Sequence, residues 1–131
     1  MDLVNLLIAL ALIQYAVFGW LVGRARYKYG VRAPAASGNE MFERYYRVQM
    51  NTLELLVLLL PAAWLASRYH GPVFVSVSIG IYIVGRIVYF MSYLSHPEKR
   101  SLGFGMSFLP ILVLLGAGLL GPVRALLGMG G

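Results

Sequence analysis

Four long apolar segments constrain this chain more than any other feature. Each is long enough to cross a lipid bilayer, which takes about 20 mostly apolar residues. They cover residues 3–22, 42–66, 73–94 and 104–120. Charged residues make up only 12% of the 131-residue chain, whereas soluble domains contain about 25%. The remaining residues leave no room for a separate soluble domain, so we expect one membrane domain over residues 1–131. Its predicted fold is an all-α bundle of four transmembrane helices.

Polar connections set the predicted helix ends. The first segment has no positive charge before it and exceeds the about 7–15 apolar residues of a signal peptide, so we expect a retained anchor. Ser37 and Glu40 have capping-box spacing, which predicts that the second helix begins near Gly38. The pair His96-Pro97 predicts the end of the third helix. We expect the glycine-rich tail, 128–131, to fray.

Basic residues are distributed unequally between the two sides of the predicted bundle. Those at the first and third loops are Arg24, Arg26, Lys28, Arg32, Arg44, Arg47, Lys99 and Arg100. Arg68 and Arg124 fall on the opposite side. Positive charge favours the cytoplasmic face, so the first and third loops should face the cytoplasm, with both termini opposite. The net charge of +6 then reflects topology, anionic lipid or an anionic ligand rather than nucleic acid. The first-loop cations are interpreted as a lipid-facing basic patch.

The chain contains no cysteine, which limits its chemistry. Disulfides, thiolate metal sites and a cysteine nucleophile are excluded, so any thiol chemistry must use a thiol supplied by the substrate. His70 and His96 stand alone near predicted turns, and we interpret neither as a metal ligand.

Two polar stripes lie within segments that should contact lipid. The first is spaced by 3, 4 and 3 residues and comprises Arg44, Arg47, Asn51 and Glu54. The second is spaced by 4, 3 and 4 residues and comprises Tyr82, Arg86, Tyr89 and Tyr93. Each spacing places its members on one face of a helix. Lys99 and Arg100 should lie at the same level, which predicts a basic pocket between helices. Its expected ligand is small and zwitterionic, with excess negative charge, and its apolar co-substrate arrives from the lipid.

Structural interpretations compete with this pocket. Arg47 and Glu54 could pair with each other, or bridge helices. Arg86 could be a buried structural charge satisfied by Glu54, by Glu43 or by helix carbonyls. The two tyrosines nearest the third loop could belong to an interfacial aromatic belt, and the third-loop cations could serve as topology signals only.

Two sequence blocks resemble the MAPEG superfamily, the membrane-associated proteins in eicosanoid and glutathione metabolism. The first is FERYYRVQMNTLE at 42–54, and the second is YIVGRIVYFMSY at 82–93. Lys99-Arg100 followed by Gly103-Phe104 continues the similarity, which extends over roughly 42–120. The match is most like the branch of microsomal glutathione transferases and leukotriene C synthase.

The resemblance implies a homotrimer that binds glutathione between neighbouring subunits on the cytosolic side. Residues that would bind the peptide part of glutathione are Arg47, Asn51, Glu54, Tyr89 and Tyr93. Gln49 points away from the Arg47 face and would serve the adjacent subunit, and Arg26 aligns loosely with a further binding arginine. Arg100 falls on the arginine that stabilises the glutathione thiolate in the family.

The chain departs from the family pattern at two places. Leu55 follows Glu54, where the eicosanoid enzymes have a tyrosine. The first helix ends in Arg24-Ala25-Arg26-Tyr27, where leukotriene C synthase has two adjacent arginines. Both departures weaken the case for leukotriene substrates and for a second catalytic arginine.

The sequence therefore favours a membrane-bound glutathione transferase in detoxification, with glutathione as co-substrate and no metal. Its second substrate would be a lipophilic electrophile, or a lipid hydroperoxide if the protein also acts as a peroxidase. One alternative is a small four-helix transporter that couples protons through Glu54, although a lone coupling carboxylate does not need Arg47, Arg86 and a tyrosine stripe. Another is a non-catalytic membrane protein that binds glutathione or lipid.

Overall fold

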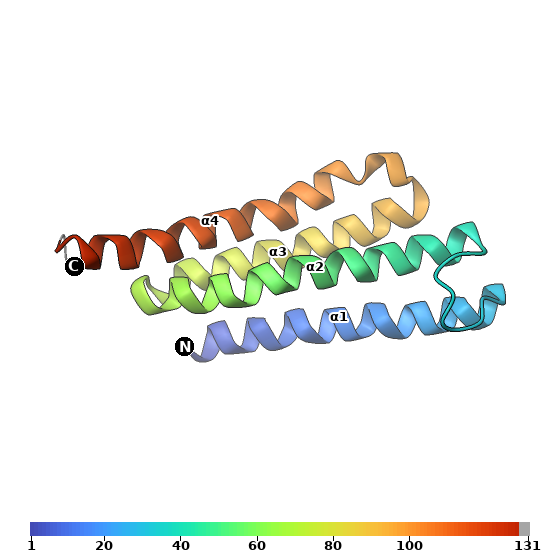
Figure 1. Ribbon diagram of the computed structural model, residues 1–131, viewed down its shortest axis with the longest axis horizontal. Coiled ribbons are helices and arrows are strands. Elements are labelled where there is room, and N and C mark those ends of the chain that lie inside the picture. The colour runs from blue at the N-terminus through green and yellow to red at the C-terminus, as the bar shows by residue number, and fades with distance from the viewer. Residues whose placement is uncertain (129–131) are drawn as a thin grey trace.

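A computed structural model describes residues 1–128 and contains four long helices that lie side by side (Figure 1). They are α1 (Asp2–Tyr29), α2 (Glu40–Tyr69), α3 (Pro72–Ser95) and α4 (Ser101–Leu126), with a short 3-10 helix, η1 (Pro97–Lys99), between the last two. All four are long and apolar enough to cross a membrane. The predicted all-α membrane bundle is confirmed. The tail after Gly128, for which fraying was predicted, lies outside the described residues.

Helix α1 continues seven residues past its predicted end at Val22, to Tyr29. Arginine, lysine and alanine are good helix formers, so a helix does not have to stop where its apolar segment stops. Gly30 ends α1 with a left-handed φ of 69°, and the N–H of Val31 donates to the Arg26 carbonyl at 3.0 Å. Most of the basic first-loop residues therefore lie on a helix.

The predicted capping box of Ser37 and Glu40 is wrong. Helix α2 begins at Glu40, with Asn39 as its N-cap, and the Asn39 side chain accepts a hydrogen bond from the backbone N–H of Phe42 at 3.0 Å. Asparagine is among the preferred N-cap residues, and Asn39 directly precedes the helix, so it caps α2 in place of Ser37. At the other connection, α3 ends at Ser95, directly before the His-Pro pair, as predicted.

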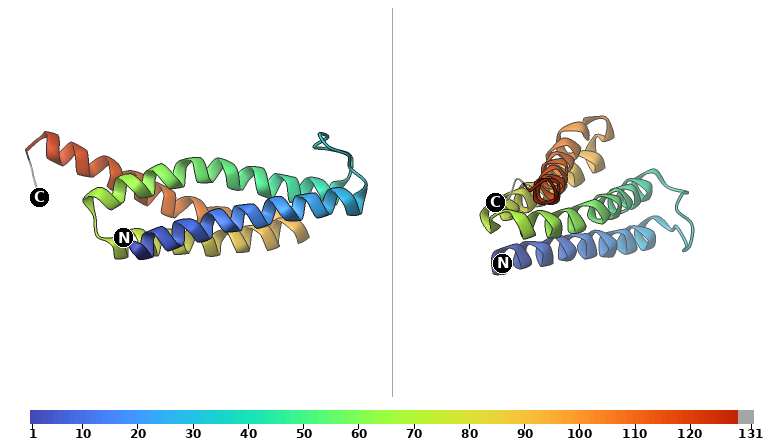
Figure 2. Two further views of the ribbon diagram at one scale, coloured as in Figure 1. Left: turned by 90° about the horizontal axis from the view of Figure 1, so that it is seen from below. Right: turned by 60° about the vertical axis from the view of Figure 1, so that its left-hand side comes forward.

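Helices α3 and α4 pack closely against each other at two glycines. A Cβ on Gly85 would lie 2.7 Å from the backbone nitrogen of Ser107, and a Cβ on Gly103 would overlap the backbone of Tyr89. Small residues at such crossings let membrane helices pack backbone to backbone. The crossing therefore fixes the backbone of Tyr89 against α4. Figure 2 shows that the C-terminal part of α4 extends past the ends of the other helices.

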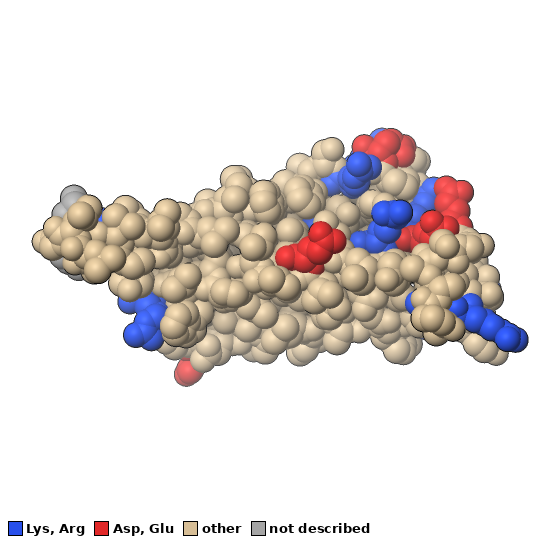
Figure 3. Space-filling model, viewed as in Figure 1, with Lys and Arg blue, Asp and Glu red and all other residues tan. Residues whose placement is uncertain are grey.

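The outer surface is largely apolar. Large apolar side chains on every helix are exposed, such as Leu6 at 55%, Val57 at 63%, Val84 at 52% and Leu119 at 66%. Such a surface is suited to lipid. Most charged side chains gather at one end of the bundle, where α1 connects to α2 and α3 connects to α4 (Figure 3). The polar chemistry of the chain is concentrated at that end.

Candidate functional site

A groove of about 600 Å³ lies at the charged end of the bundle. Helix α2, the last turns of α3 and the residue after η1 contribute most of its lining, and the α1–α2 connection contributes the rest. The lining residues are Ala36, Ser37, Glu43, Tyr46, Arg47, Met50, Asn51, Glu54, Tyr89, Tyr93 and Arg100. Six residues that the sequence predicted for glutathione are therefore brought together in one groove, from three segments of the chain.

Helix α2 supplies one wall through Arg47, Asn51 and Glu54, which are spaced by 4 and 3 residues. Arg47 and Glu54 are exposed. Between residues 1 and 128 the only salt bridge joins Arg44 to Glu40, at 2.7 Å, so the alternative pairing of Arg47 with Glu54 is absent. Both charges remain available to a ligand.

Arg44 does not join this wall, although its spacing predicted a shared face. Its guanidinium donates to the Leu94 carbonyl at 2.7 Å as well as to Glu40. Two partners therefore draw the side chain across to the end of α3. Arg44 ties α2 to α3 beside the groove rather than lining it.

Arg86 is completely buried behind the groove, and its predicted partners are wrong. Instead of Glu54, Glu43 or helix carbonyls, its guanidinium donates to three neutral side chains. Its Nη1 donates to Asn51 Oδ1 at 2.7 Å and Thr52 Oγ1 at 3.2 Å, and its Nε donates to Ser107 Oγ at 2.9 Å. The guanidinium carbon also lies 4.2 Å from the centre of the Tyr89 ring. Arg86 thus supports two groove residues from behind.

Tyr89 and Tyr93 form the α3 wall of the groove, with ring centres 5.5 Å apart. Tyr89 is only 4% exposed and also packs on Phe104 of α4, at 6.4 Å between ring centres. A residue so buried does not belong to a lipid-facing aromatic belt. The predicted polar stripe on α3 is therefore divided. Tyr89 and Tyr93 reach the groove, whereas Tyr82 lies in the apolar core.

Arg100 reaches the groove from the short connection between α3 and α4. Helix η1 reverses the chain after α3, and the Arg100 Nη1 donates to the Pro97 carbonyl at 3.1 Å. The side chain is exposed and lines the groove, whereas the neighbouring Lys99 does not. A single cation from this connection therefore faces the tyrosines and the α2 wall.

Gln49 and Arg26 lie outside this groove. The Gln49 amide packs against α1, where a Cβ on Gly19 would lie 2.9 Å from its Nε2. Arg26 Nη1 donates to the Ala35 carbonyl at 2.6 Å, and the guanidinium lies 4.8 Å from the centre of the Phe42 ring. The expected role of Gln49 in an adjacent subunit, and that of Arg26 as a further binding arginine, stay predictions.

Some lining residues were not predicted from the sequence. Met50 lies three residues after Arg47 on α2, and Tyr46 lies four residues before Met50, so helical spacing could have found both. Ala36 and Ser37 belong to the irregular α1–α2 connection, which carries no periodic signal. For residues 1–128 the structure has no cluster of three histidine, aspartate or glutamate side chains that could hold a metal ion.

Comparison with known proteins shows which family the chain belongs to. The model of the MAPEG family matches residues 4–120. The chain belongs to the MAPEG family. This MAPEG protein is 44% identical over 115 residues to an uncharacterized protein of Synechocystis sp., covering 88% of the chain and 84% of that protein. It is 40% identical over 128 residues to microsomal glutathione S-transferase 2 of Mus musculus, covering 95% and 82%. It is 32% identical over 91 residues to leukotriene C4 synthase of Cavia porcellus, covering 70% and 61%.

Proposed function

We propose that this MAPEG protein is a membrane glutathione transferase that joins glutathione to lipophilic electrophiles. The observation that carries the proposal is the convergence of Arg47, Glu54 and Arg100 in one groove, with no acidic residue paired to either arginine in the described chain. The similarity to microsomal glutathione S-transferase 2 supports glutathione as the substrate. The apolar exterior would let the second substrate arrive through the lipid.

The groove residues match the functional groups of glutathione, which has two carboxylates, one ammonium group and a central thiol. Arg47 can hold a carboxylate through two parallel hydrogen bonds, and Glu54 can hold the ammonium group. Asn51 Oδ1 already accepts from Arg86, so its amide NH2 group remains to donate to a peptide carbonyl. The phenols of Tyr89 and Tyr93 can donate to the second carboxylate or the peptide.

Arg100 would activate the thiol. A cysteine thiol in water has a pKa of about 8.5, so little thiolate is present at neutral pH. A nearby guanidinium stabilises the thiolate and does not itself lose a proton. With a chloronitrobenzene, the thiolate attacks the ring carbon, a carbon–sulfur bond forms, and chloride leaves with its bonding electrons. The thiol proton passes to water.

The proposal includes a homotrimer with the site between subunits. Gln49 and Arg26 lie on the α1 side, away from their own groove, and would complete the groove of a neighbour. The first and third loops would face the cytoplasm. Lipid hydroperoxides are a further substrate class open to the same thiolate.

The test compares purified wild-type protein with Arg100→Met and Lys99→Met in chloronitrobenzene conjugation. We expect Arg100→Met to reduce kcat about tenfold or more, because an opposite charge shifts a pKa by about 1–3 units. Its Kd for glutathione should change much less. Lys99→Met removes the same charge one residue outside the groove and should keep wild-type kcat.

Three results would contradict the proposal. Unchanged turnover in Arg100→Met removes that arginine from the mechanism. Glutathione binding by the wild type without any turnover favours a non-catalytic binding protein. Proton-coupled efflux from vesicles, with no conjugation, favours a transporter.

A further inference from the structure

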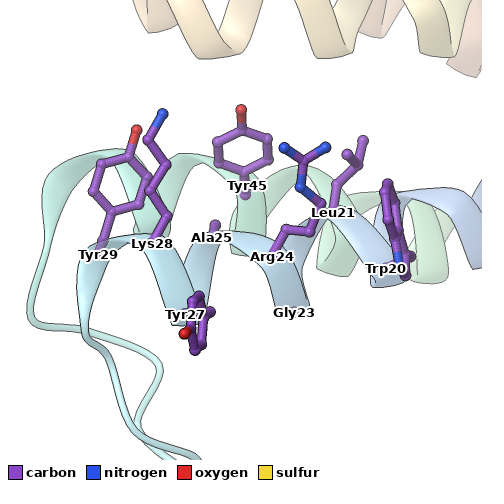
Figure 4. Close-up of a pocket in the computed structure, with 9 residues that line it drawn as sticks. All are labelled: Trp20, Leu21, Gly23, Arg24, Ala25, Tyr27, Lys28, Tyr29 and Tyr45. Atoms are coloured by element: carbon purple, nitrogen blue, oxygen red, sulfur yellow. The ribbon is translucent and has the colours of Figure 1, made fainter.

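A second groove, of about 750 Å³, lies at the same end of the bundle and shares no lining residue with the first. The last turns of α1 form most of it, and Tyr45 of α2 completes it (Figure 4). The proposed transferase chemistry uses none of these residues. The groove therefore needs its own explanation.

The groove is cationic. Arg24 and Lys28 are one turn apart on α1, and Figure 4 shows both charged groups projecting on the same side as the hydroxyls of Tyr29 and Tyr45. No acidic residue lines the groove, and across residues 1–128 neither cation forms a salt bridge. Two cations and two hydroxyl groups make a site for an anion with several oxygens, such as a phosphate.

The surroundings of the groove favour an anion that is part of an amphiphile. The Arg24 guanidinium lies 5.2 Å from the centre of the Trp20 ring, and the Lys28 ammonium lies 5.3 Å from that of Tyr29. Aromatic and basic side chains at the end of a span mark the headgroup level of a bilayer. Below Arg24 on the same helical face, at spacings of 4, 3 and 4, are Trp20, Val17 and Ile13, which are 62%, 47% and 57% exposed. An apolar track therefore leads from the cations toward the membrane interior.

We propose that this groove binds the phosphate headgroup of an anionic phospholipid. Arg24 and Lys28 hold the phosphate oxygens, the two tyrosine hydroxyls donate to it, and an acyl chain follows the exposed track on α1. A soluble phosphate would use the cations but not the track. The proposal is independent of the glutathione groove, so either can fail without the other.

Quenching of tryptophan fluorescence by brominated lipid tests the proposal, because the chain has two tryptophans in matched settings. Trp20 has Arg24 four residues later, and Trp64 has Arg68 four residues later, 5.1 Å from its ring centre. Only Trp20 lines the cationic groove. The Trp64→Phe variant keeps only Trp20, so its fluorescence reports on the groove. The Trp20→Phe variant keeps only Trp64, so its fluorescence reports on a tryptophan with a single cation and no groove.

Each variant is placed in two kinds of phosphatidylcholine vesicle. One contains brominated phosphatidylglycerol, and the other contains the same fraction of brominated phosphatidylcholine. A basic residue near the membrane surface enriches anionic lipid about fivefold. We expect brominated phosphatidylglycerol to quench Trp20 several-fold more than brominated phosphatidylcholine, and the preference at Trp64 to be clearly smaller. R24Q/K28Q should remove the preference at Trp20, whereas R32Q/R124Q, with the same net charge, should retain it.

Equal quenching of Trp20 by the two lipids would overturn the proposal, as would a preference that survives in R24Q/K28Q. Loss of the preference on adding inorganic phosphate would assign the groove to a soluble anion and would also overturn it. Wild-type conjugation of glutathione by R24Q/K28Q would show that the variant is folded and that the two grooves act separately.

Discussion

Replacing Arg86 with methionine tests whether a buried cation positions the glutathione groove. The variant keeps an unbranched stem and loses hydrogen bonds to Asn51, Thr52 and Ser107. Such bonds average about 0.6 kcal/mol in membrane bundles, so the three together contribute roughly 2 kcal/mol. Removing a charge buried without an acidic partner offsets part of that loss. We therefore expect the thermal midpoint of unfolding in detergent to change little.

Glutathione affinity should change much more than stability. Without the guanidinium, Asn51 loses a hydrogen bond of 2.7 Å and Tyr89 loses a cation 4.2 Å from its ring centre. Each side chain that must then be ordered on binding costs about 1 kcal/mol. Two such side chains raise the Kd for glutathione roughly 30-fold, since 1.4 kcal/mol is about tenfold.

Isothermal titration calorimetry on purified protein measures this Kd. Ser107→Ala is the matched control, because it removes one Arg86 hydrogen bond on the α4 side and leaves the bond to Asn51. We expect its Kd to rise no more than about threefold, the equivalent of one average bond. An Arg86→Met variant that is folded and binds glutathione as tightly as the wild type would refute the positioning role.

Other substitutions test close packing and helix ends. Gly103→Ala should separate α3 from α4 and lower both the thermal midpoint and glutathione affinity, whereas Gly105→Ala, which has open space around it, should change neither. Asn39→Ala should destabilise the first turn of α2 by about 1 kcal/mol, seen as faster amide hydrogen exchange there. Gly19→Ala should displace the Gln49 amide and weaken glutathione binding without unfolding the protein, if Gln49 completes the groove of a neighbour in the proposed trimer. An unchanged Kd for glutathione by calorimetry would argue against a role for Gln49.

The fold could be predicted because apolar length is a strong signal in a membrane protein. Four segments of the right length leave only a helix bundle, since a lipid-exposed backbone must satisfy its own hydrogen bonds. The end of α1 was not predicted correctly, because hydropathy indicates only where the apolar segment ends. The helix itself continues to Tyr29 and ends at Gly30. The start of α2 was missed because Ser37 and Asn39 are both good caps, and only the local backbone conformation selects between them.

The site was predicted only as far as helical spacing and family resemblance reach. Arg47, Asn51 and Glu54 share a face, and the structure keeps them together. Arg44 fits the same spacing, but a long side chain can be drawn away by partners on another helix. The neutral partners of Arg86 come from α2 and α4, and no spacing within one helix encodes contacts between helices.

Ultraviolet difference spectroscopy of bound glutathione tests the central claim most directly, because a thiolate absorbs where a thiol does not. A titration with pH should show that glutathione bound to the wild type ionises well below the pKa of about 8.5 of a free thiol. In Arg100→Met at saturating glutathione, the transition should return toward the value of the free thiol. Bound glutathione that remains a thiol at neutral pH, or a transition unchanged in Arg100→Met, would contradict the account.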